Sequence, residues 1–218
     1  MADEKPPSRA ELELGAPVAS LTGGQFVFNR YSLVKLVGRG RVSAVWQAWD
    51  STGNRDVALK FLPASLHENA AALADIKAAA TKVQSLKIAQ VAKIYGFEQE
   101  DQLSAVVMEY VEGNSLDALR LQKKNQVFEA ADLKEWIRQF CVTLANVHSQ
   151  TKLVHGALKP TNLVVDAKGA LIVSDFAIER VIGDWVNKQQ GAQDVSHNLR
   201  YSSPQQAMGQ ESVVTDDV

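Results

Sequence analysis

Two polar side chains lie at the ends of a pair of short apolar segments, where they can act together in chemistry. Asn162 comes directly before residues 163–165, and Asp175 stands two positions after residues 171–173. The intervening residues 166–169 have the composition of a turn, so the sequence predicts a β-hairpin. A hairpin brings both oxygen donors to one end, and amide and carboxylate oxygens are ligands that Mg²⁺ prefers.

Lys159 precedes Asn162 by three positions, and from there its ammonium group can reach a phosphate held by the metal. These residues also have ordinary structural explanations, because Asn162 can cap the hairpin and Asp175 can be a solvated loop acid. Taken singly, either residue fits the structural explanation better. The metal-site hypothesis therefore depends on the longer motif that contains them.

That longer motif resembles the catalytic loop and metal-binding turn of the protein kinases. The family pattern is His-Arg-Asp, then Leu-Lys-Pro-x-Asn, a short hairpin and Asp-Phe-Gly. The matching positions are His155, Lys159, Pro160, Asn162, Asp175 and Phe176. Three positions differ, because Gly156 replaces the Arg, Ala157 the catalytic Asp and Ala177 the final Gly. The resemblance implies a kinase frame without its general base, in which His155 packs beneath the loop.

The N-terminal half has the texture of an antiparallel sheet. Residues 31–37, 43–49 and 55–61 are rich in Val, Leu, Trp and Ala, with Gly-containing breaks between them. Two further strands are expected around residues 91–97 and 103–108. These segments predict five strands in all.

Two motifs in this half resemble the nucleotide-binding parts of kinases. Gly38 and Gly40 resemble the Gly-rich loop, in which glycines let backbone N–H groups approach phosphate oxygens. Lys60 ends a Val-Ala-Leu-Lys sequence similar to the strand whose Lys pairs the α- and β-phosphates. A Lys at a strand end is ordinarily a solvated surface residue, but its spacing from the glycines favours the nucleotide interpretation.

The resemblance implies ATP and Mg²⁺ as cofactors. The implied nucleotide-binding residues are Val37, Gly38, Gly40, Val45, Ala58, Lys60, Glu109, Val111 and Val164. Backbone groups of Glu109 and Val111 would meet the adenine edge. Asn162 and Asp175 would hold the metal, while Lys60 and Lys159 would act on the phosphates.

Residues 68–86 are Ala-rich and predict a helix where kinases carry a Glu that clamps the strand Lys. Ile76 or Ala79 falls near that position, and Asp75 is the only nearby acid. The register is open by a few residues. The partner of Lys60 is therefore expected to be lost or irregular.

Residues 132–148 carry apolar side chains at three- and four-residue spacing, which predicts an amphipathic helix. Asp132 and Glu135 resemble a capping box, and Cys141 is expected in the core. Ser115 is a typical N-cap, and it predicts a short helix that begins after it. Asp217 matches a buried Asp of the kinase family.

Composition restricts the class of protein. The chain has 218 residues, 46% hydrophobic and 22% charged, with a net charge of −2, so nothing favours nucleic-acid binding. No apolar run is long enough for a membrane span, and a single cysteine suits a reducing cytosol, so we expect a cytoplasmic location.

The expected fold is α+β, the two-lobe fold of protein kinases. Residues 1–25 are interpreted as a flexible leader. Residues 26–111 form an N-lobe with a five-stranded antiparallel sheet and one helix. Residues 112–218 form a partial helical C-lobe that stops at the start of its central helix, so we expect a fragment.

Three functions stay open, and the loops look most like those of bacterial Ser/Thr kinases. The first is a pseudokinase, a nucleotide-binding switch or scaffold in signalling with a protein partner. The second is an active but atypical Ser/Thr kinase that transfers the ATP γ-phosphate to a protein substrate. The third is a truncated interaction module that does not use ATP. Ala157 favours the first without deciding whether the chain is an enzyme.

Overall fold

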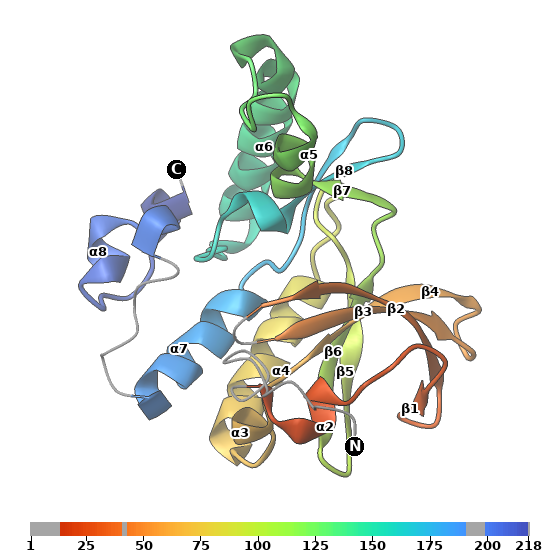
Figure 1. The fold of residues 1–218 in the computed structure, drawn as a ribbon. Coiled ribbons are helices and arrows are strands. Elements are labelled where there is room, and N and C mark those ends of the chain that lie inside the picture. The colour runs from red at the N-terminus through yellow and green to blue at the C-terminus, as the bar shows by residue number, and fades with distance from the viewer. Residues whose placement is uncertain (1–13, 41–42, 191–198, 218) are drawn as a thin grey trace. The chain divides into compact units, whose positions relative to one another are not determined.

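The computed structural model describes residues 14–40, 43–190 and 199–217. The chain divides into two compact units, and each is described here by itself (Figure 1). The first contains the chain up to Thr81 and Ile94–Tyr110, and the second contains Lys82–Lys93 and everything from Val111 onward. The sequence places residues 82–93 in the N-lobe, but the backbone bonds these residues to the second unit. Val173 N donates to Gln90 O at 2.8 Å, and Ala92 N donates to Val173 O at 2.9 Å.

The first unit is built on a six-stranded antiparallel sheet of order β1-β2-β3-β4-β6-β5. Its strands are β1 (Phe26–Val27), β2 (Tyr31–Arg39), β3 (Ala44–Asp50), β4 (Arg55–Phe61), β5 (Ile94–Glu100) and β6 (Leu103–Glu109). The five predicted strands are present, and β1 is an additional short edge strand. Alternate residues of β3 are buried, as expected for a strand with one face on a core.

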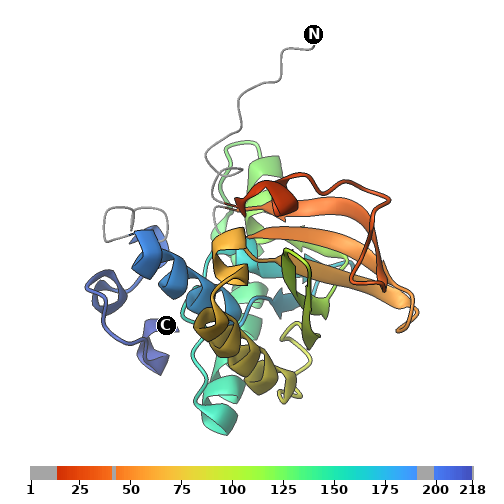
Figure 2. The same cartoon turned by 90° about the horizontal axis from the view of Figure 1, so that it is seen from below.

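Residues 14–25 differ from the predicted flexible leader. Leu14 and Val18 are fully buried, and α2 (Ala16–Ala19) lies against α3 (Ala64–His67) (Figure 2). Gly15 makes the close approach possible, because a Cβ on it would stand 2.7 Å from the Cβ of Ala64. The apolar residues recur at helical spacing, which gives this segment a face to bury. Residues 1–13, the rest of the predicted leader, lie outside the described residues.

Helix α4 (Ala70–Gln84) matches the helix predicted over residues 68–86. It begins at Ala70 because Asn69 caps it, with Ala72 N donating to Asn69 Oδ1 at 3.0 Å. Ile76 is fully buried and Ala79 is buried, whereas Asp75 is exposed. The buried face of this helix is therefore apolar in the part where the family pattern has its Glu.

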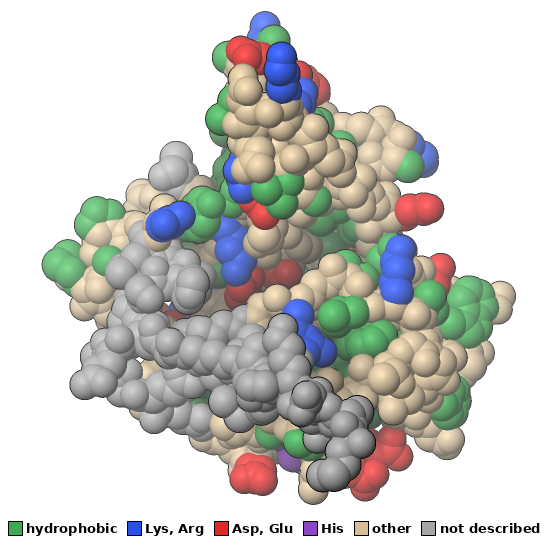
Figure 3. Space-filling model, in the orientation of Figure 1, with side chains coloured by type: hydrophobic (Ala, Val, Ile, Leu, Met, Phe, Trp, Pro, Cys, Tyr) green, Lys and Arg blue, Asp and Glu red, His purple; other side chains and the backbone are tan. Residues whose placement is uncertain are grey.

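The second unit contains helices α5 (Leu116–Gln122) and α6 (Ala130–Thr151). Ser115 caps α5 as predicted, accepting a hydrogen bond from Ala118 N at 3.2 Å. The capping box of α6 lies three residues earlier than predicted, with Glu129 as N-cap and Asp132 at the third helical position. Glu135 instead pairs with Arg138. Charged side chains of both signs gather where α5 ends and α6 begins (Figure 3).

Helix α6 buries a narrower stripe than the sequence predicts. Leu144 and Val147 are buried, but Ile137 and Cys141 are exposed, so the expectation of a core cysteine is wrong. The apolar positions of this helix extend around two sides, and only one side meets the rest of the unit. No helix in the described part of the chain combines the length and apolar character that crossing a membrane requires.

A three-stranded sheet completes the part of the unit that matters for chemistry. It has the order β7 (Gly113–Ser115), β8 (Leu163–Asp166) and β9 (Leu171–Val173). The remaining elements of the described residues are α7 (Ile178–Gln190), α8 (Pro204–Ala207) and the 3-10 turns at Pro160–Asn162, Leu199–Tyr201 and Val214–Asp217. Leu171 N donates to Gln139 Oε1 at 2.8 Å, which fixes the β8–β9 hairpin on α6.

Candidate functional site

The predicted β-hairpin is confirmed and sets the position of the metal-binding candidates. Strands β8 and β9 are antiparallel, with Leu163 opposite Val173. Ser174 N donates to Asn162 O at 2.9 Å, so the hairpin brings Asn162 beside the residue that precedes Asp175. Asp175 has φ 61°, a left-handed conformation that turns the chain sharply out of β9. The two predicted oxygen donors therefore leave the hairpin at the same end.

Residues 155–162, called the 155–162 loop below, are held from beneath by Asp217. Asp217 is 3% exposed, and its carboxylate accepts backbone hydrogen bonds from His155 N at 2.7 Å and Gly156 N at 2.9 Å. His148 Nε2 donates to it at 3.0 Å. Because a buried carboxylate receives two backbone donors and an imidazole, the start of the loop has little freedom to move.

His155 has the structural role that the sequence predicts. Its ring is fully buried and packs on Phe176, with the ring centroids 5.0 Å apart. Nε2 donates to Ser174 O at 2.9 Å, and Nδ1 accepts from Ala157 N at 3.2 Å. Burial lowers the pKa of this imidazole, which is consistent with a neutral ring that donates through one nitrogen and accepts through the other.

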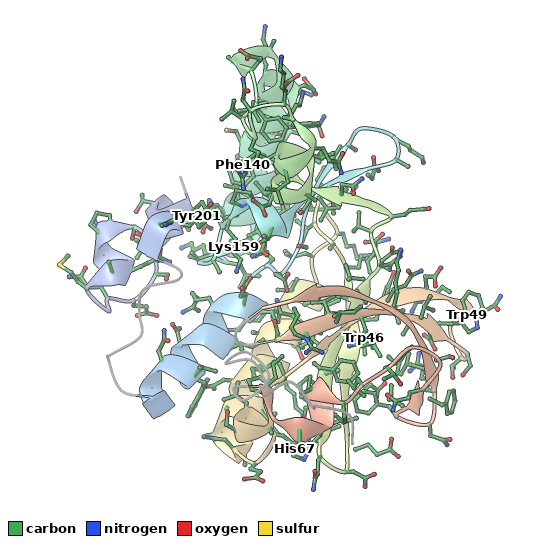
Figure 4. All side chains as sticks on the ribbon, viewed as in Figure 1. Trp46, Trp49, His67, Phe140, Lys159 and Tyr201 are labelled. Carbon is green, nitrogen blue, oxygen red and sulfur yellow. The ribbon has the colours of Figure 1, made fainter. Side chains whose placement is uncertain are left out.

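Glu179 is a candidate site residue that the sequence motifs do not indicate. It lies in the first turn of α7 and is buried. Its Oε1 pairs with Lys159 Nζ, and its Oε2 accepts from Asn162 Nδ2 at 2.6 Å. Lys159, Asn162 and Glu179 are called the Glu179 cluster below; Figure 4 labels Lys159, on the side of the 155–162 loop that faces α7. The available signal was a lone acid in the apolar sequence Phe-Ala-Ile-Glu.

Asn162 also contacts Ala157, the position where the family has its catalytic Asp. Its Nδ2 donates to Ala157 O at 2.9 Å as well as to Glu179. The Asn162 amide group therefore contacts both Ala157, which has no carboxylate, and Glu179 of α7. The side chain of Ala157 is a methyl group, so any carboxylate chemistry in this cluster has to come from Glu179.

Arg180 lies over Gly156, the position where the family has an Arg. Gly156 has φ 68°, and a Cβ built on it would stand 2.2 Å from Arg180 Cδ. Arg180 Nη1 also pairs with Asp184 Oδ2 at 3.2 Å. Glu179 and Arg180 are consecutive on α7. The family Arg and Asp are replaced by Gly156 and Ala157, and α7 supplies a positive and a negative side chain nearby, Arg180 and Glu179.

The close approach of Arg180 gives a stability test. We expect Gly156→Ala to lower the free energy of unfolding by about 1–2 kcal/mol, because an L residue is strained at this φ and its Cβ collides with Arg180. In an Arg180→Ala background the same change should cost only the backbone part, about 1 kcal/mol. Denaturant unfolding of the four proteins checks this. An equal cost in both backgrounds would show that Arg180 does not lie there.

The donor chemistry at the hairpin end fits a magnesium ion. Asn162 uses its amide nitrogen in two hydrogen bonds, so its Oδ1 remains the oxygen for a ligand; among the described residues it accepts only a long contact from Thr161 Oγ1 at 3.4 Å. Within the same residues, no group of three or more His, Cys, Asp or Glu side chains is arranged to hold an ion. Two hard oxygens, from Asn162 and Asp175, match a Mg²⁺ ion whose other ligands are phosphate and water.

Three of the predicted residues of the first unit form a row across three strands. Gly38 lies opposite Val45, and Val45 lies opposite Lys60 on β4. Lys60 is 2% exposed. No described atom lies within 4 Å of a Cβ built on Gly38, so its backbone is open to a ligand. The register thus brings the Gly-rich segment and the strand lysine together.

The other predicted residues of this group are spread more widely. Ala58 is buried opposite Met108, whereas Val37 is about half exposed at the end of β2. Glu109 is the last residue of β6 in the first unit. Val111 and Val164 belong to the second unit, so their predicted contact with adenine stays a prediction.

The chain belongs to the protein kinase family. The model of the protein kinase domain matches residues 31–217, which includes most of both units and every motif described above. This confirms the family and fold predicted from the motifs around Lys60, Asn162 and Asp175.

Individual relatives place the chain among proteins similar to bacterial Ser/Thr kinases. It is 28% identical over 187 residues to the serine/threonine-protein kinase PrkC of Bacillus subtilis, covering 85% of this chain and 28% of PrkC. It is 29% identical to PknB of Mycobacterium tuberculosis, covering 91% of this chain and 32% of PknB. The chain therefore spans about a third or less of these relatives' length.

Solved structures show the same fold. The kinase domain of M. tuberculosis PknI superimposes with a TM-score of 0.70 at 17% sequence identity, covering 91% of this chain and 71% of that one. At this identity the match supports the fold, and the chemistry has to be argued from the residues in place.

Proposed function

We propose that this chain is a nucleotide-binding pseudokinase, a switch or scaffold that binds ATP with Mg²⁺ and signals through a protein partner. The observation that carries the proposal is the state of the 155–162 loop. Lys159, Asn162 and Asp175 match the family pattern. Ala157 stands where the family has the Asp that takes a proton from the substrate hydroxyl. Binding groups for metal and phosphate are thus kept, and the group needed for transfer is missing.

The first unit supports the same proposal independently. Lys60 is buried in the row that contains Gly38 and Val45, and the buried face of α4 offers Ile76 and Ala79 where the family pattern has an acid. A kinase needs that acid to fix the strand lysine for transfer. Nucleotide binding can persist without it, because the lysine itself is present. A cytoplasmic location belongs to the proposal, since the exposed free thiol of Cys141 suits a reducing compartment.

A second candidate function has its own supporting observation. The Glu179 carboxylate and Ala157 O both accept hydrogen bonds from Asn162 Nδ2. Glu179 is therefore a carboxylate for proton transfer near the position where the catalytic Asp is missing. An active, atypical Ser/Thr kinase would use Glu179 in this way. Phosphate transfer, treated in the Discussion, separates this candidate from the pseudokinase.

Thermal unfolding with nucleotide tests the proposal. ATP with Mg²⁺ at 100 times its Kd should raise the free energy of unfolding by about 2.7 kcal/mol. Lys60→Met, which keeps the apolar stem of the buried side chain, should remove most of this gain. Lys168→Met, on the exposed hairpin turn, is the matched control and should retain it. A melting temperature that millimolar ATP and Mg²⁺ leave unchanged would favour the interaction module that does not use ATP.

A further inference from the structure

The Glu179 carboxylate occupies the ammonium group that a phosphate would use. It holds the ammonium of Lys159 in an ion pair, and it accepts a hydrogen bond from Asn162 Nδ2 at 2.6 Å. Glu179 is buried, and its partner Lys159 is mostly buried. Charge-assisted bonds between poorly solvated groups are stronger than those at the surface. Anything that takes Lys159 away from Glu179 therefore has to offer at least an equal anion.

A terminal phosphate would compete directly with this carboxylate. Both are oxyanions that seek the same ammonium group, and at close range they repel each other. The backbone of α7 gives Glu179 little freedom to step aside, because Ile178 and Ile182 of the same helix are fully buried. The first turn of α7 would have to shift before a phosphate could replace the Glu179 carboxylate on Lys159.

We infer that Glu179 is a specificity-determining residue that makes this chain prefer a nucleoside diphosphate to a triphosphate. The inference rests on the proposed function, in which Lys159 binds the terminal phosphate of the nucleotide. A diphosphate lacks this terminal phosphate, so it can bind while the Glu179 cluster stays intact. A triphosphate brings its terminal phosphate to Lys159, which Glu179 already holds. Separating this pair costs free energy, so the triphosphate binds more weakly than it would without Glu179.

The same contact couples the terminal phosphate to α7. A ligand shifts a conformational equilibrium only by the difference in its affinity for the two states. A diphosphate makes no contact that distinguishes an intact from a broken Glu179 cluster, so it leaves α7 in place. A triphosphate binds more tightly when the cluster is broken, so it favours a shifted α7. The position of α7, which follows Asp175, would in this way depend on which nucleotide is bound.

Binding measurements on matched variants test the inference. Titration calorimetry with ADP and with ATP, both with Mg²⁺, should show a preference for ADP on the order of tenfold in the unmodified protein. Glu179→Gln keeps the shape and an acceptor for Asn162 but removes the charge, so ATP should gain on the order of tenfold while ADP is unchanged. Asp184→Asn removes another α7 carboxylate and should preserve the ADP preference.

Lys159→Met provides a second, independent readout. In the unmodified background it should lower ATP affinity by the smaller factor, because separating the Glu179–Lys159 pair offsets part of what the lysine contributes to binding. In the Glu179→Gln background it should reduce ATP affinity clearly, because the lysine is then available to phosphate. Amide exchange over residues 178–190 should increase with ATP and not with ADP.

Each outcome has a defined meaning. An ADP-to-ATP ratio that Glu179→Gln leaves unchanged would overturn the inference while the pseudokinase proposal stands. A loss of ATP affinity in Glu179→Gln would overturn it by showing that Glu179 helps to bind metal or nucleotide. If neither nucleotide binds to the unmodified protein or to Glu179→Gln, the proposed function itself fails. Circular dichroism and melting curves of every variant ensure that a loss of binding is not a loss of fold.

Discussion

Radiolabelled phosphate transfer from ATP by this chain is expected to be no faster than transfer by its Asp175→Ala variant. In the kinase family the loop Asp orients the substrate hydroxyl and accepts its proton. Ala157 can do neither, because its side chain is a methyl group. A positioned general base contributes about 10²–10⁴-fold to rate, which corresponds to roughly 3–5 kcal/mol of activation free energy.

The measurement uses a generic protein substrate and the chain itself as phosphate acceptors. Transfer well above the Asp175→Ala blank would contradict the pseudokinase proposal. If Glu179→Gln then abolished that transfer, the atypical kinase would be the correct alternative, with Glu179 as the group that accepts the hydroxyl proton. If Glu179→Gln left the transfer intact, the proton would have to leave through another group.

Restoring the family residue by Ala157→Asp should raise transfer little by itself. The new carboxylate would lie close to Glu179, because Asn162 Nδ2 already bonds both Ala157 O and Glu179 Oε2. Two carboxylates at such range disfavour each other's charged form. The C-helix acid is also missing from the buried face of α4. Ala157→Asp with Glu179→Gln should therefore be more active than Ala157→Asp alone, and restoring an acid at Ile76 should add to this.

The parts of the site that were predictable are those coded by neighbouring residues. The β8–β9 hairpin was predictable because Asp166 and Gly169 define a turn between two apolar runs: Asp166 Oδ1 accepts from Lys168 N and Ala170 N, and Gly169 has φ 83°. The N-cap at Ser115 is equally local. Such features depend on a few successive residues, so a single sequence specifies them.

The parts that were missed depend on how a helix approaches a distant loop. Nothing near Glu179 or Arg180 in sequence indicates that they meet Asn162 and Gly156. That contact requires the left-handed residues Asp175 and Ala177, with φ 61° and 60°, to direct α7 back onto the loop. Ala177 stands where the family has Gly, and the sequence alone gave no reason to expect the same backbone conformation there.

Two smaller errors have a common physical origin. The capping box of α6 was placed at Asp132 and Glu135 instead of Glu129 and Asp132, because acids three residues apart occur twice in succession. Cys141 was placed in the core because apolar residues cover more of α6 than the unit buries. In both cases the local pattern allows neighbouring registers, and the packing of the helix decides between them.

The largest effect on stability is expected from Asp217→Ala. The change removes the acceptor of His155 N, Gly156 N and His148 Nε2. Leaving buried backbone donors without partners costs about 1–3 kcal/mol for each group. We therefore expect the free energy of unfolding of the second unit to fall by roughly 3 kcal/mol or more. Asp217→Asn should cost less, because one side-chain oxygen can still accept.

Asp216→Ala is the matched control for this prediction. Asp216 is the neighbouring acid, and its carboxylate accepts from Val213 N at 2.7 Å in an exposed turn. The carboxylate also bonds the Ser203 side chain. Its loss should cost only about 1 kcal/mol, because water can replace these hydrogen bonds at an exposed site. The readout is amide exchange at His155 and Gly156 together with the melting temperature. Exchange at both amides should accelerate strongly in Asp217→Ala and little in Asp216→Ala. Equal exchange in the two variants would mean that Asp217 does not hold the 155–162 loop, and the arrangement of the Glu179 cluster on that loop would then need another support.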